Sequence, residues 1–521
     1  MVATNIPETA LAFPLPPRRP SFLLPLLLTL LLPASVLRAQ DPAGHIEPKP
    51  RHEDPVLLDL PPLPPEAKVR QSITLDGRAL GYTCSVQALP VRDEKGRKVA
   101  EVVCTSYLAG DPASRPVTFA VNGGPGSSSM WLNLGALGPR RVSFGAPEDE
   151  PSDPPRFQDN PGTWLDFTDL VFIDPVGTGY SRALVDGDEA ARRFYTIQGD
   201  AACLARVVHD WLAREGRLAS PKFLVGESYG AFRAPRIAAA LQNDLGVNLA
   251  GLVLVSPILD GSIMTWTSVS PLPWMVRLPT LAAARLERQG RLGAGAMAPV
   301  EAYARTEFAA DLLRGWSDPA ALERLSRRVA EYTGLDPDLV RREGGRVGDS
   351  AGQREPFRAQ GRVGSPYDLN WTLPDPYPWD LFPHGDVDAL WKAQAILSGA
   401  MVQFFARTVG WRPEARYIGI NQEVNAKWET PNANWWPTAE SVSHLRKVLA
   451  LDGRLKVLFA HGWTDLVTPY FASRLIVDQL PPLGDPGRVR LKVYPGGHMF
   501  YARPESLKAF HDDGRALVLG R

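Results

Sequence analysis

Short apolar, β-branched runs recur along the chain and alternate with segments that have helical spacing. Five of these runs lie at 170–174, 222–225, 251–255, 455–460 and 489–494. Continuous apolar strands separated by helices are typical of a parallel sheet that is covered on both faces. The pattern therefore predicts an α/β protein with a mostly parallel central sheet flanked by helices.

The pattern also divides the chain into a core and an insertion. Further β-like runs precede the alternating region, at 72–76, 80–89, 98–108 and 116–121. Between Asp260 and about Thr438 the alternation lapses, and helical patterns cover 281–290, 298–313, 319–334 and 391–407, with a Gly/Arg-rich piece at 341–364. We therefore expect a first core part at 66–262, a largely helical cap insertion at 263–440 and a second core part at 441–521.

The amino terminus has the pattern of an export signal. Arg18 and Arg19 precede a run of 11 mostly apolar residues, Phe22–Leu32. A basic region, an apolar stretch of about 7–15 residues and a small residue describe a secretory signal peptide, whereas a membrane anchor needs about 20 apolar residues. We predict a signal peptide at 1–39, cleaved near Ala39, a Pro-rich linker at 40–65, and an exported (periplasmic or secreted) protein with no stable membrane span after cleavage.

Composition and charge exclude several classes of protein. The 521 residues include 57 basic and 57 acidic side chains, so the basic footprint of a nucleic-acid-binding protein is absent. No Cys/His cluster has zinc spacing and no Gly-rich phosphate loop occurs, so we predict no metal and no cofactor. Of three cysteines, Cys84 and Cys104 lie in two runs that could form a hairpin. They are either disulfide-bonded or two buried thiols.

A candidate nucleophile lies in the segment 222–232. Here an apolar strand is followed by Gly226-Glu227-Ser228-Tyr229-Gly230 and by a helix start. Strand, G-x-S-x-G and helix form the context of a nucleophile elbow. A second match, Gly348–Gly352, follows a polar stretch and precedes a poor helix start, so the pattern favours Ser228 over Ser350.

A serine nucleophile needs a base, and the base needs a carboxylate. Of eight histidines, His498 lies in a Gly-rich loop after the last predicted strand, whereas the others lie in the linker, in helical patterns, in the insertion or at a strand end. The loop after the preceding strand contains Asp465. The chain order Ser228, Asp465, His498 is that of α/β-hydrolases, so we predict this catalytic triad.

Acyl transfer also needs hydrogen-bond donors for the developing oxyanion. Asn122–Gly126, with the sequence Asn-Gly-Gly-Pro-Gly, follows the predicted strand 116–121. Glycines let main-chain amides approach a bound ligand closely. This loop and the amide of Tyr229, next to the candidate nucleophile, are the predicted donors.

These motifs resemble those of the serine carboxypeptidase family (peptidase family S10) of α/β-hydrolases. The resemblance also includes Asp174–Ser181 and Gly497-His498-Met499. It implies an α/β-hydrolase fold, peptide substrates cut at their last residue without a metal, and an acyl-enzyme on Ser228. It further implies an oxyanion hole formed by the amides of Gly124 and Tyr229, with Asn122 and Glu227 binding the substrate's terminal carboxylate.

The chain departs from the family pattern at four positions. Ala120, Ala136, Ser127 and Tyr501 stand where the family usually has Trp, Glu, Cys and Pro. Half of the carboxylate-recognition network is therefore missing, and strict preference for a chain end is in question. Two alternatives follow: an esterase or acyltransferase of the same fold, and a catalytically inactive binding protein. The sequence predicts nothing about the oligomeric state.

The role implied for Glu227 has a consequence for pH. Two carboxylates in contact do not both stay ionised at low cost, so Glu227 would hold a proton when it meets a terminal carboxylate. We therefore expect kcat/KM for free-acid peptides to be higher at about pH 5 than at about pH 8.

Overall fold

The computed structural model describes residues 55–520, except for 112–113, 147–148, 268, 381–382, 386 and 430–435. The predicted signal peptide and the first part of the predicted linker lie outside the described residues. Within the described part, no helix is both long and apolar enough to cross a membrane.

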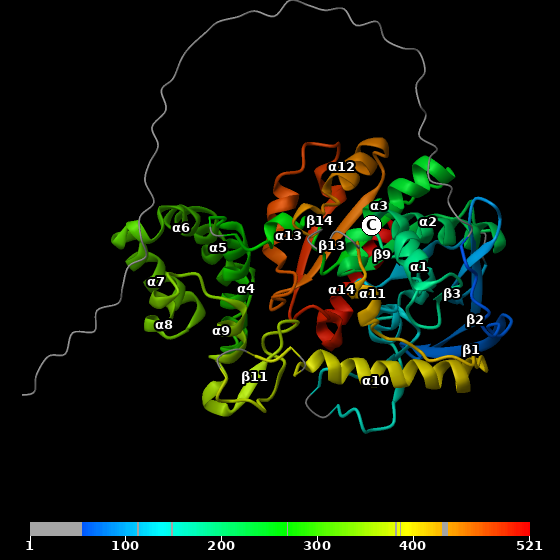
Figure 1. Cartoon of the computed structure of the whole chain (residues 1–521), viewed down its shortest axis with the longest axis horizontal. Helices are drawn as coiled ribbons and strands as arrows, with labels where there is room; N and C mark the ends of the chain where they lie inside the picture. Colours follow the sequence, from blue (N-terminus) through cyan, green and yellow to red (C-terminus); the bar gives the residue numbers. More distant parts are fainter. Residues whose placement is uncertain are drawn as a thin grey trace, which may run out of the picture. The chain divides into compact units, whose positions relative to one another are not determined.

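A ten-stranded sheet forms the centre of the protein, in the order β1-β2-β3-β7-β4-β9-β10-β13-β14, with β8 paired to β3 (Figure 1). The pairs β1–β2, β2–β3 and β3–β7 are antiparallel, whereas every pair from β7 to β14 is parallel. The strands are β1 (Ala67–Leu75), β2 (Arg78–Arg92), β3 (Lys98–Leu108), β4 (Val117–Val121), β7 (Asp169–Ile173), β8 (Arg182–Ala183), β9 (Lys222–Glu227), β10 (Gly251–Val255), β13 (Lys456–Gly462) and β14 (Val489–Tyr494). The mostly parallel sheet predicted from the sequence is confirmed.

Helices cover both faces of the sheet, and successive strand residues contribute to two different cores. In β10, Leu254 belongs to the core under α2 and α3, whereas Val253 and Val255 belong to the core on the other face. The helices on the first face are α1 (Gly187–Phe194), α2 (Ile197–Arg214), α3 (Tyr229–Leu245), α12 (Val442–Leu451) and α13 (Tyr470–Asp478); those on the second are the π-helix η1 (Trp131–Leu137), α10 (Ala389–Gln403) and α14 (Pro504–Leu519). Burial on both faces explains why the inner parallel strands β4, β7, β9 and β10 are largely apolar.

The insertion between β10 and β13 is mostly helical but includes a small sheet. Its elements are α4 (Leu272–Arg288), α5 (Ala294–Tyr303), α6 (Ala309–Arg314), α7 (Pro319–Thr333), α8 (Pro337–Arg342), α9 (Asp349–Arg354), α10, α11 (Gln422–Ala426) and the hairpin β11 (Arg362–Gly364) with β12 (Thr372–Pro374). Figure 1 shows α4 to α8 gathered beside α13, in green. By contrast, α10 and the following π-turn pack on the core through Leu397, Phe404 and Phe405, so part of the insertion completes the core.

The hairpin of β2 and β3 settles the state of its two cysteines. Cys84 is opposite Tyr107, and Cys104 is opposite Gln87. The two cysteines also belong to the cores on opposite faces of the sheet. Both are buried free thiols, so the disulfide alternative is excluded.

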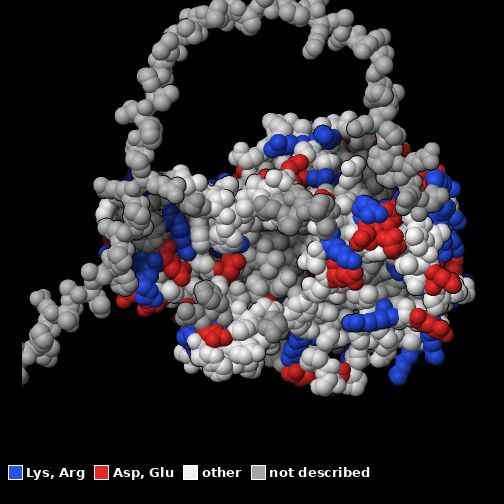
Figure 2. All heavy atoms as spheres, viewed as in Figure 1, with Lys and Arg blue, Asp and Glu red and all other residues white. Residues whose placement is uncertain are grey.

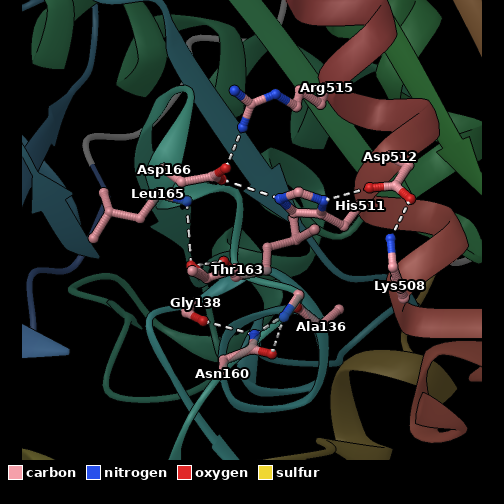
Figure 3. A network of polar contacts seen from close by, with 12 residues as sticks. Ala136, Gly138, Asn160, Thr163, Leu165, Asp166, Lys508, His511, Asp512 and Arg515 are labelled. Carbon is pink, nitrogen blue, oxygen red and sulfur yellow. Dashed lines mark hydrogen bonds and ion pairs between the residues drawn. The ribbon is translucent and has the colours of Figure 1, made fainter. Parts of the chain in front are cut away.

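Polar contacts fasten the C-terminal helix and η1 to the segment before β7 (Figure 3). His511 contacts Asp166 at 3.1 Å and Asp512 at 3.1 Å. Asn160 donates to the carbonyls of Ala136 and Gly138, both at 2.8 Å. These bonds hold the end of η1, whose first residue, Trp131, lines the candidate site.

The charged side chains are mixed in sign. Figure 2 shows Lys and Arg interspersed with Asp and Glu over the visible face, in keeping with the formal net charge of +0.

Candidate active site

Ser228 lies at a sharp turn between β9 and α3. Its backbone has φ 59° and ψ −124°, a region that costs energy for a residue with a side chain. The flanking glycines allow the turn: a Cβ at Gly226 would lie 2.2 Å from the carbonyl oxygen of Gly230, and one at Gly230 would lie 2.3 Å from that of Val121. Close main-chain contacts on both sides of the strained serine therefore require the two glycines of the motif.

Asp465 and His498 form a buried pair on the loops after β13 and β14. The Nδ1 of His498 lies 2.8 Å from Oδ2 of Asp465. The side chain of Asp465 is 0% exposed and that of His498 is 4% exposed. Because Nδ1 faces the carboxylate, Nε2 is the nitrogen that remains for the cavity.

Further donors fix the carboxylate of Asp465. Its Oδ1 accepts from the amides of Val467 at 2.9 Å and Thr468 at 3.0 Å, and its Oδ2 accepts from the Thr468 hydroxyl at 2.5 Å. Burial alone would raise the pKa of Asp465, but the charge of His498 and these hydrogen bonds lower it. The carboxylate therefore stays ionised beside the imidazole.

The contact with Asp465 shifts the pKa of His498 upward, opposite to the shift of Asp465. Burial lowers the pKa of His498, but the carboxylates of Asp465 and Glu227 outweigh burial and raise it. An imidazole held this way accepts a proton more readily than an isolated buried histidine.

Two residues that sequence reasoning missed hold the loop of His498. Ser256 Oγ donates to the carbonyl of His498 at 2.7 Å, and the amide of His498 donates to the carbonyl of Tyr367 at 2.5 Å. The Tyr367 ring also packs edge-on against the imidazole, with centroids 5.4 Å apart. Of the two, only Ser256 leaves a weak signal in the sequence, because it directly follows an apolar strand.

Ser228 and His498 line one cavity of about 410 Å³, together with Asn122, Gly124 and Glu227. Within the described residues, Ser228 Oγ makes no hydrogen bond to the imidazole. Catalytic hydrogen bonds are often long before substrate binds and tighten afterwards. The structure thus brings Ser228 and His498 to one cavity, with Asp465 buried behind the imidazole and no hydrogen bond yet between the serine and the imidazole.

The Asn122–Gly126 loop lies directly beside the elbow. A Cβ at Gly123 would be 2.4 Å from the amide nitrogen of Tyr229, so only glycine allows this approach. Gly124 is exposed to the cavity, and within the described residues its amide donates no hydrogen bond. The amides of Gly124 and Tyr229, predicted as oxyanion donors, therefore lie just after the neighbouring strands β4 and β9.

Glu227 is buried in a small polar network on the same cavity wall. The Tyr501 hydroxyl donates to its Oε2 at 2.7 Å. The side chain of Asn122 also hydrogen-bonds to it, while Oδ1 of Asn122 accepts from the amide of Leu132 at 3.1 Å. Burial raises the pKa of Glu227 to about 7, although His498, Tyr501 and Asn122 act to lower it. Tyr501, identified in the sequence only as a departure from the family pattern, is thus a hydrogen-bond partner of Glu227.

The rejected candidates lie elsewhere. Ser350 is in helix α9 rather than at a turn. His461 is fully buried in β13, with its Nε2 2.9 Å from Ser473 Oγ. His209 and His384 contact neighbouring aspartates, and none of these four residues lines the cavity of Ser228.

A solved structure confirms the class of fold. The crystal structure of KEX1(delta)p, a prohormone-processing carboxypeptidase from Saccharomyces cerevisiae, aligns with a TM-score of 0.51 at 16% identity, over 84% of this chain and 90% of that one. The protein has an α/β-hydrolase fold.

The sequence comparisons find similarity to one family. Residues 104–285 match the family model of the serine carboxypeptidases, which confirms the predicted relationship to that family. The chain is 34% identical over 137 residues to the pheromone-processing carboxypeptidase kex1 of Schizosaccharomyces pombe and 27% identical over 246 residues to serine carboxypeptidase-like 27 of Arabidopsis thaliana. These matches cover 26% and 45% of this chain, and 24% and 47% of the relatives' lengths.

Proposed function

We propose that the protein is a serine-type carboxypeptidase that releases C-terminal residues from peptides through an acyl-enzyme on Ser228. One observation carries the proposal: the buried Asp465–His498 pair, joined at 2.8 Å, opens onto the cavity that the strained Ser228 and the Asn122–Gly126 loop also line. Nucleophile, oriented base and oxyanion donors are the parts that acyl transfer needs.

In acylation, His498 Nε2 would take the Ser228 hydroxyl proton as Oγ attacks the scissile carbonyl. Asp465 would stabilise the imidazolium that forms and keep its proton on Nδ1. The amides of Gly124 and Tyr229 would hold the oxyanion. The imidazolium would then protonate the leaving amine, and a water, activated by the same imidazole, would release the acyl group.

Asn122 and Glu227 would receive the terminal carboxylate of the substrate. A pKa of about 7 for Glu227 means that the side chain carries its proton in mildly acid solution, where it can donate to a carboxylate. Export is also proposed, on the basic and apolar pattern of the first 39 residues.

The test compares a free-acid peptide with its C-terminally amidated twin. The proposal expects the free acid to be cleaved at least about tenfold faster in kcat/KM at about pH 6, because only the free acid offers a carboxylate to Glu227. Ser228→Ala should remove both activities. Equal cleavage of the two peptides would reject an exopeptidase.

The esterase or acyltransferase alternative is favoured by one observation. Ala136 stands where the family usually has a glutamate, and a hydroxyl, that of Tyr501, contacts Glu227. If amidated peptides and small esters are cleaved as well as free acids, this alternative replaces the carboxypeptidase.

A further inference from the structure

A second cavity, of about 820 Å³, lies beside the catalytic cavity. Tyr367 and Met499 line both cavities, and Gly497, next to His498, lines the second one. The two cavities therefore share a wall at the loop that carries the catalytic histidine.

Aromatic contacts show on which side of the catalytic cavity the second one lies. Trp131 lines the catalytic cavity and Phe144 lines the second, and their ring centroids are 6.0 Å apart. Phe144 also packs edge-on against Tyr501, at 6.4 Å, and Tyr501 holds Glu227. The second cavity thus adjoins the wall that would receive the leaving end of a peptide.

Most charges on the second cavity are already paired. Glu150 contacts Lys392 at 3.0 Å, and Asp368 contacts Arg503 at 2.8 Å. These two pairs account for both carboxylates among the lining residues.

Two lining arginines, Arg141 and Arg362, form no ion pair within the described residues. Arg141 makes one long hydrogen bond, of 3.4 Å, to the carbonyl of Ala502. Arg362 donates to the hydroxyl and the carbonyl of Thr372, at 2.8 and 2.6 Å. Open N–H groups of a guanidinium suit the two oxygens of a carboxylate.

The surroundings of Arg141 leave its charge poorly compensated. Burial lowers the pKa of Arg141, and the acid that opposes this effect, Asp149, accepts hydrogen bonds from Ser143 and Ala146, at 3.1 and 2.9 Å, rather than from the guanidinium. A carboxylate ligand would supply the missing counter-charge.

We propose that this second cavity binds a carboxylate on the leaving side of the substrate, with Arg141 as the main contact and Arg362 as a second one. The proposal rests on the proposed function and extends it to a class of substrate. The carboxylate belongs either to the acidic side chain of the released residue or to its chain end, which Arg141 would then share with Asn122 and Glu227.

The test measures binding in the Ser228→Ala background, where nothing is cleaved. Three peptides that differ only at the last residue are titrated by calorimetry: one ending in free Glu, one in free Gln and one in Gln amide. A charge-assisted pair predicts that one of the two carboxylates tightens binding about 10- to 100-fold, and that Arg141→Gln removes this gain.

The pattern across the peptides identifies the source of the carboxylate. If Arg141→Gln loses only the preference for Glu over Gln, Arg141 contacts the acidic side chain. If it loses only the preference for the free acid over the amide, Arg141 contacts the chain end. The control, Arg206→Gln, removes an equal but paired charge that lines neither cavity and should keep both preferences. If Arg141→Gln keeps both preferences, the proposal is wrong.

Two further outcomes distinguish a loss of binding from a folding defect and from failure of the proposed function. If Arg141→Gln melts below the assay temperature, Arg362→Gln is compared in the same way, with a smaller loss expected and an unchanged preference contradicting the proposal. Failure of the Ser228 enzyme to cleave any of the peptides, with the Arg141-dependent preference intact, would reject the proposed function but not the site.

Discussion

Two walls of one cavity differ in how closely they keep the pattern of the serine carboxypeptidases. The wall of Ser228 and His498 keeps it, with the strained elbow and with Asp465 buried behind His498 at 2.8 Å. The wall of Asn122 and Glu227 departs from it, since Ala136 replaces a glutamate and Tyr501 donates to Glu227. The comparison teaches that bond-making groups and substrate-end recognition are separable parts of the site.

The largest effect is expected from a change behind the first wall, which contains Ser228 and His498. Asp465→Asn would present an amide to Nδ1 and favour the wrong tautomer of His498, so we expect kcat to fall about 10⁴-fold, as in other serine triads. Steady-state kinetics on a free-acid peptide measure it. The control is Asp166→Asn, which alters a different Asp–His pair, at His511, and should leave kcat within about twofold. Comparable losses in both variants would contradict the assignment.

The second wall is tested through pH. The ratio of kcat/KM for a free-acid peptide to that for its amidated twin cancels the ionisation of His498, which both substrates need. Because the pKa of Glu227 is raised to about 7 and the protonated form is the one that receives a carboxylate, the ratio should be high in acid and fall as pH rises through that value. We expect about a tenfold fall between about pH 5 and pH 8.

Glu227→Gln is the control for this profile. A glutamine does not titrate but still donates, so the ratio should become independent of pH. A ratio in the unaltered enzyme that stays flat or rises with pH would exclude Glu227 from carboxylate binding.

A smaller effect sharpens the role of Tyr501. Its hydroxyl stabilises the ionised form of Glu227, so Tyr501→Phe should raise the pKa of Glu227 further and move the fall of the ratio to higher pH by about one unit. Tyr494→Phe, which removes a comparable bond to Asp513 at 2.8 Å, should not move it. An unchanged midpoint in Tyr501→Phe would mean that Tyr501 only packs.

The sequence predicted the fold, and it singled out the three residues proposed as a triad, because both leave local signals. Apolar strands at 251–255 and 489–494 have the same bounds in the structure, and Gly226 and Gly230 are required by close main-chain contacts. The contributions of Tyr367, Tyr501 and Arg141 had no such signal. Each depends on segments far apart in sequence that the fold brings together, such as Tyr501 and Glu227.

The most direct test of the account is the site of covalent labelling by a fluorophosphonate, read by peptide mass spectrometry on the folded protein. Activation by the Asp465–His498 pair predicts one adduct, on Ser228, that is lost in Ser228→Ala and strongly slowed in Asp465→Asn. A folded protein that is unlabelled, or labelled at another serine such as Ser350, would contradict it.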